Sequence, residues 1–299
     1  MIASSFTELI GNTPLVKFKL PGFPEVNFYV KMESYNPTGS IKDRACIYNI
    51  NSAIRKGHLT KNKIILDASS GNMACALSYF GKILGFKVKV VCNSKLTEDK
   101  KNFIRFFGAE LEMIGDMTIE GNNWCRNLSE SPEGIDKFCF MDQLHNPANP
   151  LASYETLGPE IHNALPNIKA VIGSMGSGGS MCGVARYFKE RKNDTMIFTS
   201  QSASGTKIPG TGSFVDGDYV TPFITELRAN YSDTFMINQS QAEVRTKELR
   251  EQGIYAGFQA GGVLEASYNS IEKYKLKGDV VMIIGDAGWK NMDKLKAII

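Results

Sequence analysis

Short β-branched runs alternate with amphipathic stretches along most of this 299-residue chain, and this alternation limits the folds open to it. In the first half the pairs of runs and stretches are 64–66 with 73–84, 88–91 with 97–107, and 111–114 with 121–128. A strand followed by a helix and then by another strand forms a parallel sheet with helices on its faces. The alternation therefore predicts an α/β fold.

A second series of the same kind begins near residue 151. It predicts helices at 151–163, 179–190, 240–252 and 261–274, and strands at 170–173, 196–199 and 280–284. Two series predict two doubly wound α/β domains, one of residues 35–147 and a larger one of residues 1–34 plus 148–299. The segment 202–219 is rich in Gly, Ser, Pro and Thr, so we expect a long loop there, and long loops often cover sites.

Composition narrows the classes of partner. A hydrophobic content of 42% supports a full core, and 34 basic against 31 acidic residues, with no basic stripe, do not predict nucleic-acid binding. The six cysteines have no C-x-x-C pair, and no signal-peptide pattern or apolar membrane span is found, so we expect a soluble, cytoplasmic protein. Three histidines without paired spacing predict neither a metal site nor a Ser-His-Asp triad.

The octapeptide Pro37–Arg44 holds one lysine after a turn and at the mouth of a predicted helix. Ser40 is the expected N-cap, which places Lys42 in the first helical turn. A cation there opposes the helix dipole, so Lys42 is easier to explain if its amine is neutral or bonded as an imine. The alternative is a solvated loop lysine, the commonest use of this residue.

Two further turns have the composition of anion-binding loops. The run Gly176-Ser177-Gly178-Gly179-Ser180 lies between a predicted strand and a helix, where backbone N–H groups and the helix dipole are directed at an anion. The run Ser69-Ser70-Gly71-Asn72-Met73 has the same setting. The alternatives are a flexible turn for the first and a capping turn for the second. Without a Gly-Lys-Ser/Thr signature, the first loop is not a nucleotide P-loop.

Five motifs in order and in register give a resemblance that covers nearly the whole chain. They are Asn12-Thr13-Pro14-Leu15, the octapeptide, Ser70-Gly71-Asn72, Gln143 with Asn146–Asn149, and Gly176–Ser180. Together they resemble the cysteine synthase family of pyridoxal 5'-phosphate (PLP) enzymes. The resemblance implies the tryptophan synthase β-subunit fold, with the PLP site in the cleft between two domains.

The resemblance also implies roles for individual residues. Lys42 matches the lysine that forms the Schiff base with PLP and then acts as general base, and Asn72 matches the residue that contacts the ring hydroxyl of the cofactor. The phosphate cradle corresponds to Gly176, Ser177, Gly178, Gly179 and Ser180. The residues that bind the substrate carboxylate in the family correspond to Ser69, Ser70, Met73 and Gln143.

Three positions depart from the family pattern. Met73 replaces a threonine, so only its backbone N–H can serve the carboxylate. Ala287 replaces the serine of P-D-S-G that commonly meets the pyridine nitrogen, and Gln259 stands where a related form has the serine of G-I-S-T-G. We therefore predict Gln259 as the partner of the ring nitrogen. A neutral partner does not favour a long-lived quinonoid carbanion, so elimination is the expected course.

The resemblance implies a β-replacement on O-acetylserine or O-phosphoserine with sulfide, forming L-cysteine through an aminoacrylate intermediate. One alternative is an L-cysteine desulfhydrase or lyase that releases hydrogen sulfide. Another is a regulatory subunit that kept only the fold, although Lys42 and an intact cradle disfavour it. The run Asp286–Lys290 is closer to that of O-phosphoserine-using enzymes. A phosphate leaving group needs a nearby cation, which Lys207 or Arg228 can supply, but Asp216 and Asp218 would repel it. The leaving group therefore stays open.

Similar enzymes are homodimers, and some bind the C-terminal isoleucine peptide of a serine acetyltransferase in the substrate cleft. The partners that the resemblance implies are thus an amino-acid substrate and sulfide, a second copy, and such an acetyltransferase. This chain itself ends in Ile298-Ile299, which is typical of ordinary hydrophobic surface.

Overall fold

The computed structural model describes residues 2–69, 71–94 and 96–298. The chain divides into two compact units, one of Met1–Ile10 with Lys42–Asn149 and a larger one of Gly11–Ile41 with Pro150–Ile299. The octapeptide spans the boundary, since Ile41 ends one segment and Lys42 begins the next. The domain limits expected from the sequence, 35–147 and 1–34 plus 148–299, stay a prediction.

The smaller unit is built on a four-stranded parallel sheet in the order β5-β4-β3-β6. Its strands are β3 (Ile64–Ala68), β4 (Val88–Cys92), β5 (Glu110–Met113) and β6 (Phe138–Phe140), and its helices are α1 (Lys42–Arg55), α2 (Asn72–Ile83), α3 (Glu98–Phe106) and α4 (Thr118–Glu130). Side chains of α1, α2 and α3 form one core with Ile65 and Val90. Leu66 and Val91, which point the opposite way, form a second core with α4.

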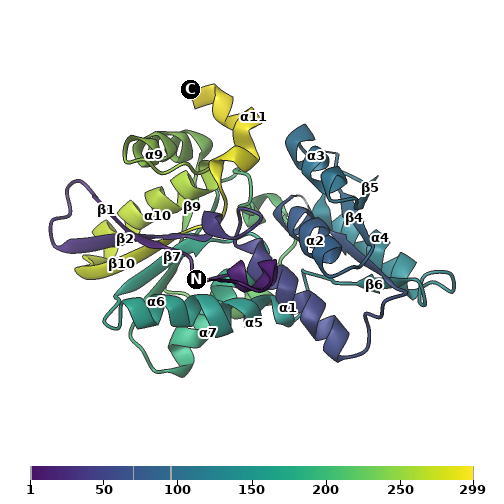
Figure 1. Ribbon diagram of the computed structural model, residues 1–299. Coiled ribbons are helices and arrows are strands. Elements are labelled where there is room, and N and C mark those ends of the chain that lie inside the picture. The colour runs from purple at the N-terminus through teal and green to yellow at the C-terminus, as the bar shows by residue number, and fades with distance from the viewer. Residues whose placement is uncertain (1, 70, 95, 299) are drawn as a thin grey trace. The chain divides into compact units, whose positions relative to one another are not determined.

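The larger unit has a six-stranded sheet in the order β1-β2-β10-β7-β8-β9, in which only β1 and β2 pair antiparallel. The strands are β1 (Leu15–Phe18), β2 (Val26–Met32), β7 (Ala170–Ser174), β8 (Met196–Ser202), β9 (Asp233–Ile237) and β10 (Gly278–Ile284). The helices are α5 (Ala148–Ala152), α6 (Gly158–Ala164), α7 (Gly179–Glu190), α8 (Pro222–Arg228), α9 (Gln239–Glu251), α10 (Phe258–Tyr274) and α11 (Met292–Leu295). Figure 1 shows α9 and α10 on one face of this sheet and α6 and α7 on the other, each over its own core.

Short helical turns complete the structure. They are 3-10 turns at Phe6–Leu9, Glu33–Tyr35, Phe214–Asp216, Gly288–Asn291 and Lys296–Ile298, and a π-helical turn at Ser153–Leu157. The segment from Ala203 to Val220 forms the predicted loop, interrupted only by the turn Phe214–Asp216.

Most predicted elements are confirmed to within a few residues, but the helix at 151–163 is not continuous. It is divided into α5, the π-helical turn and α6. Pro159 has no N–H to donate to the carbonyl of Glu155, and the Thr156 hydroxyl donates to the Ala152 carbonyl at 2.5 Å, in competition with the helical bond. Both effects favour a widened turn.

The sequence did not predict β1, β6 and β9. All three lie at the edge of a sheet and have three to five residues. β1 and β9 carry polar residues that weaken their burial pattern, whereas β6 is apolar but has only three residues, too few to show a strand period.

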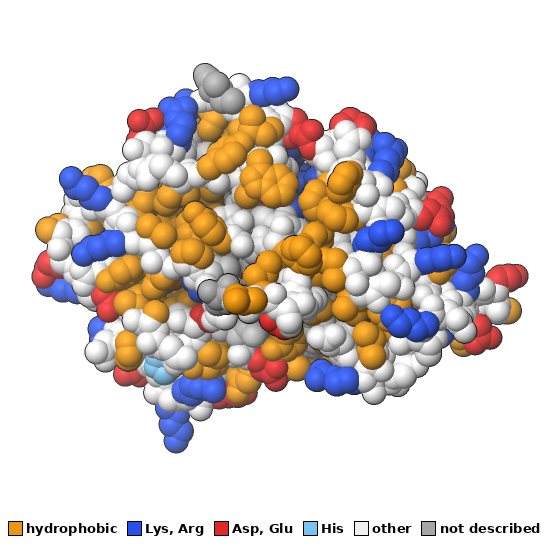
Figure 2. Space-filling model, viewed as in Figure 1, with side chains coloured by type: hydrophobic (Ala, Val, Ile, Leu, Met, Phe, Trp, Pro, Cys, Tyr) orange, Lys and Arg blue, Asp and Glu red, His pale blue; other side chains and the backbone are white. Residues whose placement is uncertain are grey.

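The face in view in Figure 2 carries basic and acidic side chains interspersed, without a continuous basic stripe. Among the described residues, no helix is both long and apolar enough to cross a membrane. All six cysteine side chains are buried.

Candidate active site

Lys42 is the first residue of α1. Its surroundings exclude enough water to lower the pKa of its amine to about 8, although the nearby Asp67 acts in the opposite direction. The predicted N-cap role of Ser40 is wrong, because the helix begins two residues later and Ser40 instead forms an antiparallel bridge with Asp286. Within the described part of the chain, the Ser40 hydroxyl has no hydrogen-bond partner.

The turn that precedes Lys42 is held by the segment after β10. The Ile41 N–H donates to the Gly285 carbonyl at 2.9 Å, and the Ala287 N–H donates to the Gly39 carbonyl at 3.0 Å. These two bonds flank the bridge between Ser40 and Asp286. Ala287 therefore acts here through its backbone, which needs no hydroxyl side chain.

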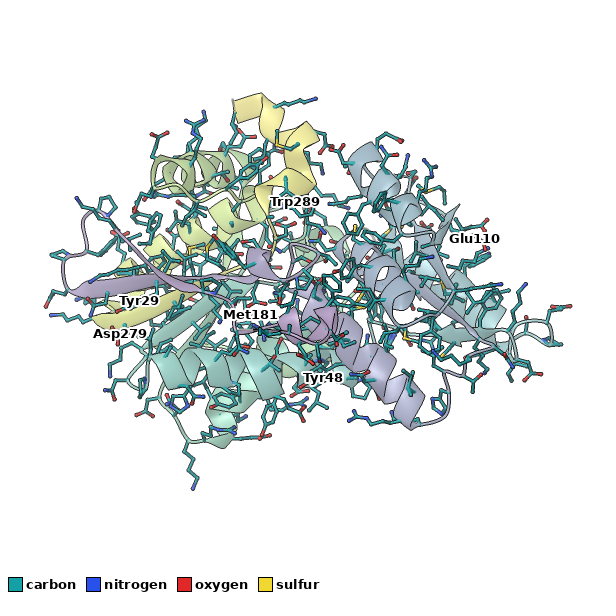
Figure 3. All side chains as sticks on the ribbon, in the orientation of Figure 1. Tyr29, Tyr48, Glu110, Met181, Asp279 and Trp289 are labelled. Atoms are coloured by element: carbon teal, nitrogen blue, oxygen red, sulfur yellow. The ribbon has the colours of Figure 1, made fainter. Side chains whose placement is uncertain are left out.

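Side chains of the same segment reinforce this contact. Trp289, labelled in Figure 3, lies over Gly39, where an added Cβ would come within 2.5 Å of the indole ring. Gly39 also has φ +76°, a conformation that favours glycine. Lys290 is buried and donates from Nζ to the Thr38 carbonyl at 2.7 Å. The unusual run Asp286–Lys290 thus fixes the backbone immediately before Lys42.

The predicted carboxylate loop follows β3 in the smaller unit. The Ser69 N–H donates to the Val91 carbonyl at 2.9 Å, which continues the hydrogen bonding between β3 and β4. The Gly71 N–H donates to the Ser69 hydroxyl at 3.2 Å. Gln143 is buried and donates from Nε2 to the Ala68 carbonyl at 2.7 Å, while its own carbonyl accepts from Asn149. The fold therefore brings the loop and Gln143 together.

The other loop residues differ in orientation. Asn72 begins α2, with no side-chain cap on that helix. The Met73 side chain is only 1% exposed and packs in the core of the smaller unit, so only its backbone faces the loop. Ser70 lies outside the described residues.

The predicted phosphate cradle lies between β7 and α7 in the larger unit. Gly178 caps α7 with φ +83°, and an added Cβ there would lie 2.7 Å from Cγ1 of Ile224. An added Cβ on Gly176 would lie 2.9 Å from the Gly210 carbonyl oxygen. Both glycines are required by close packing, and the N–H groups of the first turn of α7 stay available to an anion.

Two further residues adjoin the cradle, Gly212 of the predicted loop and Thr221, which was not predicted. The Thr221 hydroxyl donates to the Ser177 carbonyl at 2.7 Å and also accepts from the Ile224 N–H at the start of α8. The Gly212 N–H donates to the Met175 carbonyl at 2.9 Å. The signal for Thr221 was present in the sequence, because Thr-Pro before an apolar run is a helix start.

Gln259 lies near the cradle on the first turn of α10. Its Nε2 donates to the Gly210 carbonyl at 3.0 Å. Its Oε1 is buried with no hydrogen-bond partner among the described residues, and an added Cβ on Gly285 would lie 2.2 Å from that oxygen. Nε2 carries a second hydrogen, so Gln259 has a spare donor as well as a spare acceptor on the same unit as the cradle.

The candidate residues therefore form two groups. Lys42, Ser69, Asn72, Met73 and Gln143 belong to the smaller unit, and Gly176–Ser180 with Gln259 belong to the larger one. The cradle glycines fit a ligand that has an anionic phosphate, as PLP has, and the second Nε2 hydrogen of Gln259 is a donor that an unprotonated ring nitrogen can accept. Among the described residues, no cluster of His, Cys, Asp and Glu is arranged to hold a metal ion.

One residue beside the first group escaped sequence reasoning. Asp67 is fully buried at the end of β3, and burial together with the charge of Asp142 raises its pKa to about 8. The signal was a single carboxyl in the otherwise apolar strand Ile64–Ala68.

Comparison with known proteins agrees with this geometry. Residues 6–286 match the family described as pyridoxal-phosphate dependent enzyme. Cysteine synthase B of Salmonella typhimurium is 30% identical over 295 residues, which cover 95% of this chain and 93% of the relative. Cysteine synthase of Helicobacter pylori is 28% identical, with 98% of this chain and 99% of the relative covered.

Solved structures give the same fold. A hydrogen sulfide-producing enzyme of Fusobacterium nucleatum has a TM-score of 0.88 and 27% identity, covering 97% of this chain and 98% of its own. Cysteine synthase of Entamoeba histolytica has a TM-score of 0.90, with 100% and 92% covered, and at 24% identity it supports the fold alone. The chain belongs to the pyridoxal-phosphate dependent enzyme family, and within it to the cysteine synthases. It is an α/β, PLP-dependent enzyme of cysteine synthesis or a related reaction.

Proposed function

We propose that this enzyme replaces the β-substituent of O-acetylserine or O-phosphoserine with sulfide to form L-cysteine. The observation that carries the proposal is Lys42, a lysine at the head of α1 whose amine is desolvated enough to bring its pKa to about 8. A solvated loop lysine would not have this property. Relatives that are named cysteine synthases support the same reaction.

In this proposal the cofactor is held by residues of both groups. Lys42 bonds its aldehyde carbon, Gly176–Ser180 bind its phosphate through backbone N–H groups, Asn72 contacts its ring hydroxyl and Gln259 its ring nitrogen. When bound, PLP supplies an electron sink for the charge left at Cα of the substrate.

Lys42 is also the proposed general base for the Cα proton. With a pKa of about 8, roughly 10% of its amine is uncharged at pH 7, against well below 0.1% for an ordinary lysine. A base works best when its pKa lies near the working pH. Burial of Lys42 therefore supplies the required form at neutral pH.

The substrate carboxylate is assigned to the loop after β3. The Ser69 hydroxyl accepts from Gly71, which leaves its own proton to donate. Gln143 uses one Nε2 hydrogen on Ala68 and has a second, and Asn72 and Met73 contribute N–H groups at the start of α2. Together with Ser70, these are donors suited to a carboxylate.

A second candidate function is release of hydrogen sulfide from L-cysteine. It is favoured by similarity to the Fusobacterium nucleatum enzyme, described as hydrogen sulfide-producing, and by the departures at Met73, Gln259 and Ala287. The predicted cover loop and Arg228 beyond it do not favour a phosphate leaving group. Arg228 lies over the Phe214 ring at 5.7 Å, and Asp216 is bonded to Ser204 and Ser213.

The deciding experiment compares two sulfide assays on the purified, PLP-loaded protein. One measures sulfide consumption with O-acetylserine or O-phosphoserine, and the other measures sulfide release from L-cysteine alone. Consumption with negligible release supports the synthase and identifies the leaving group. Rapid release with negligible consumption supports the desulfhydrase and contradicts the primary proposal.

We further propose a cytosolic homodimer that can bind the C-terminal peptide of a serine acetyltransferase. Light scattering measures the mass in solution, and a monomer mass would contradict the dimer. A pull-down with an isoleucine-terminated peptide, with a peptide lacking the isoleucine as control, tests the partner.

A further inference from the structure

The loop that adjoins the phosphate cradle is rich in glycines with unusual backbone angles. It runs from Ala203 to Val220, and Gly205, Gly210 and Gly217 in it have φ values from +71° to +92°. A segment of this kind has many conformations open to it, so fixing it in one of them has a large entropic cost. The single conformation of the loop therefore depends on contacts that tie its segments together.

The carboxylate of Asp216 makes such contacts. The Ser213 and Ser204 hydroxyls donate to it at 2.6 and 2.7 Å, and the Gly205 N–H donates at 3.0 Å. The bonds from Ser213 and Ser204 lower the pKa of Asp216, so the group is ionised at neutral pH. Because these donors lie on both sides of the segment 206–212, Asp216 closes that segment. We refer to Asp216 and its three donors as the clamp.

The segment 206–212 lies against the first residues of the cradle. The Gly212 N–H donates to the Met175 carbonyl at 2.9 Å, directly before Gly176. An added Cβ on Gly176 would come within 2.9 Å of the Gly210 carbonyl oxygen. The glycines of the cradle have no side chains that could fix their own backbone, so its conformation depends on this support from the loop.

Other contacts anchor the same segment from its inner side. The Ser202 N–H donates to the Gly212 carbonyl at 2.9 Å, and the Ile208 side chain is only 1% exposed in the core shared with α9 and α10. Asp216 and Ser204, in contrast, are exposed. Loss of the carboxylate should therefore loosen the loop without unfolding the larger unit.

We propose that Asp216 is a positioning residue for the phosphate cradle. By closing the loop it keeps Gly210 and Gly212 against the cradle, so the backbone N–H groups that receive a phosphate are arranged before the ligand binds. Such an arrangement raises affinity, because the ligand does not have to order the loop. The inference rests on the proposed role of Gly176–Ser180 in binding the phosphate of PLP.

The test compares two ligands of the PLP-free, full-length protein. Pyridoxal has the aldehyde and the ring of PLP but lacks the phosphate, so the ratio of the two dissociation constants, each measured by imine absorbance, reports the cradle. In Asp216→Ala, PLP should bind about 3- to 10-fold more weakly, as expected for loss of hydrogen bonds to a carboxylate. Pyridoxal binding should stay at its wild-type value. Asp194→Ala removes an exposed acid of the same unit and should change neither constant.

Variants of Ser204 test the same contact from its other side. Because the Ser204 hydroxyl donates to Asp216, Ser204→Ala should weaken PLP binding by about 2- to 3-fold. It should add no further loss to Asp216→Ala, since both changes remove one contact. Ser204→Thr keeps a hydroxyl and should bind PLP like the wild type. Additive losses in the double variant would show that the two residues act separately and would overturn the inference.

The outcomes separate this inference from the function itself. If PLP and pyridoxal lose affinity equally in Asp216→Ala, or if neither does, the cradle stands and the inference is wrong. If Asp216→Ala does not fold, an unchanged ratio in Ser204→Ala overturns the inference. If the wild type binds PLP no more tightly than pyridoxal, the cradle is wrongly assigned, and the proposed function fails as well.

Discussion

Substitution of Gly178 by alanine tests the cradle most sharply. Gly178 has φ +83°, which costs about 1 to 2 kcal/mol for a residue with a Cβ. The new Cβ would also lie 2.7 Å from Cγ1 and 3.0 Å from the backbone N of Ile224, which is fully buried. Crowding of this kind costs about 1 to 3 kcal/mol. The total for Gly178→Ala is therefore roughly 2 to 5 kcal/mol.

A matched control separates the two contributions. Gly253, after α9 in the same unit, has φ +80° and nothing within 4 Å of an added Cβ, so Gly253→Ala carries only the backbone cost. If the loop moves to relieve the crowding at Ile224, binding of the phosphate must reverse that movement. The difference of about 1 to 3 kcal/mol then appears as PLP affinity weakened by about 5- to 150-fold in Gly178→Ala.

The assay is a fluorescence titration of each PLP-free variant with PLP, together with urea unfolding. Gly253→Ala should bind PLP like the wild type while losing some stability. The reasoning is refuted if Gly178→Ala binds PLP within twofold of wild type and unfolds at the same urea concentration as Gly253→Ala.

Three further predictions use other contacts. Gln259→Ala removes the proposed ring-nitrogen partner and the bond to Gly210, so the PLP absorbance band should shift or Cα-proton exchange should change rate, and an unchanged spectrum and rate would exclude the assignment. The carboxyl of Asp67 has a pKa of about 8 in the folded protein, so it keeps a proton that the unfolded chain releases near pH 4. As the pH rises from 4 to 8, the free energy of unfolding of the wild type should therefore fall by about 1 kcal/mol or more beyond the fall in Asp67→Asn. Parallel curves of stability against pH for the two proteins would contradict this prediction. Gly39→Ala should destabilise the protein by roughly 2 kcal/mol and alter Trp289 fluorescence, whereas an unaltered emission would show that the ring does not lie there.

Local sequence chemistry was sufficient to place the two predicted anion-binding loops between a strand and a helix, and Lys42 in the first turn of a helix. Glycines before a helix, with an apolar strand ahead of them, define the cradle within a single stretch of chain. The same local reasoning was wrong for Ser40, because a tertiary bridge to Asp286 competes with capping. A preference of about 1 kcal/mol for a capping serine is easily overridden by such a contact.

Long-range contacts were beyond sequence reasoning. Nothing near Gly39 in the sequence indicates Trp289, which is 250 residues away, and the spare acceptor of Gln259 depends on the carbonyl of Gly210. The burial of Asp67 depends on the packing of α1 and α4 against opposite faces of β3. Only the folded chain reveals these relations.

Identification of the lysine that bonds PLP tests the central claim most directly. The PLP-loaded protein is reduced with borohydride, digested and analysed by mass spectrometry, with Lys42→Ala as the control. The account predicts reduced PLP on the peptide that contains Lys42, and no visible imine band in the variant. Label on another lysine, or a band that survives in Lys42→Ala, would contradict it.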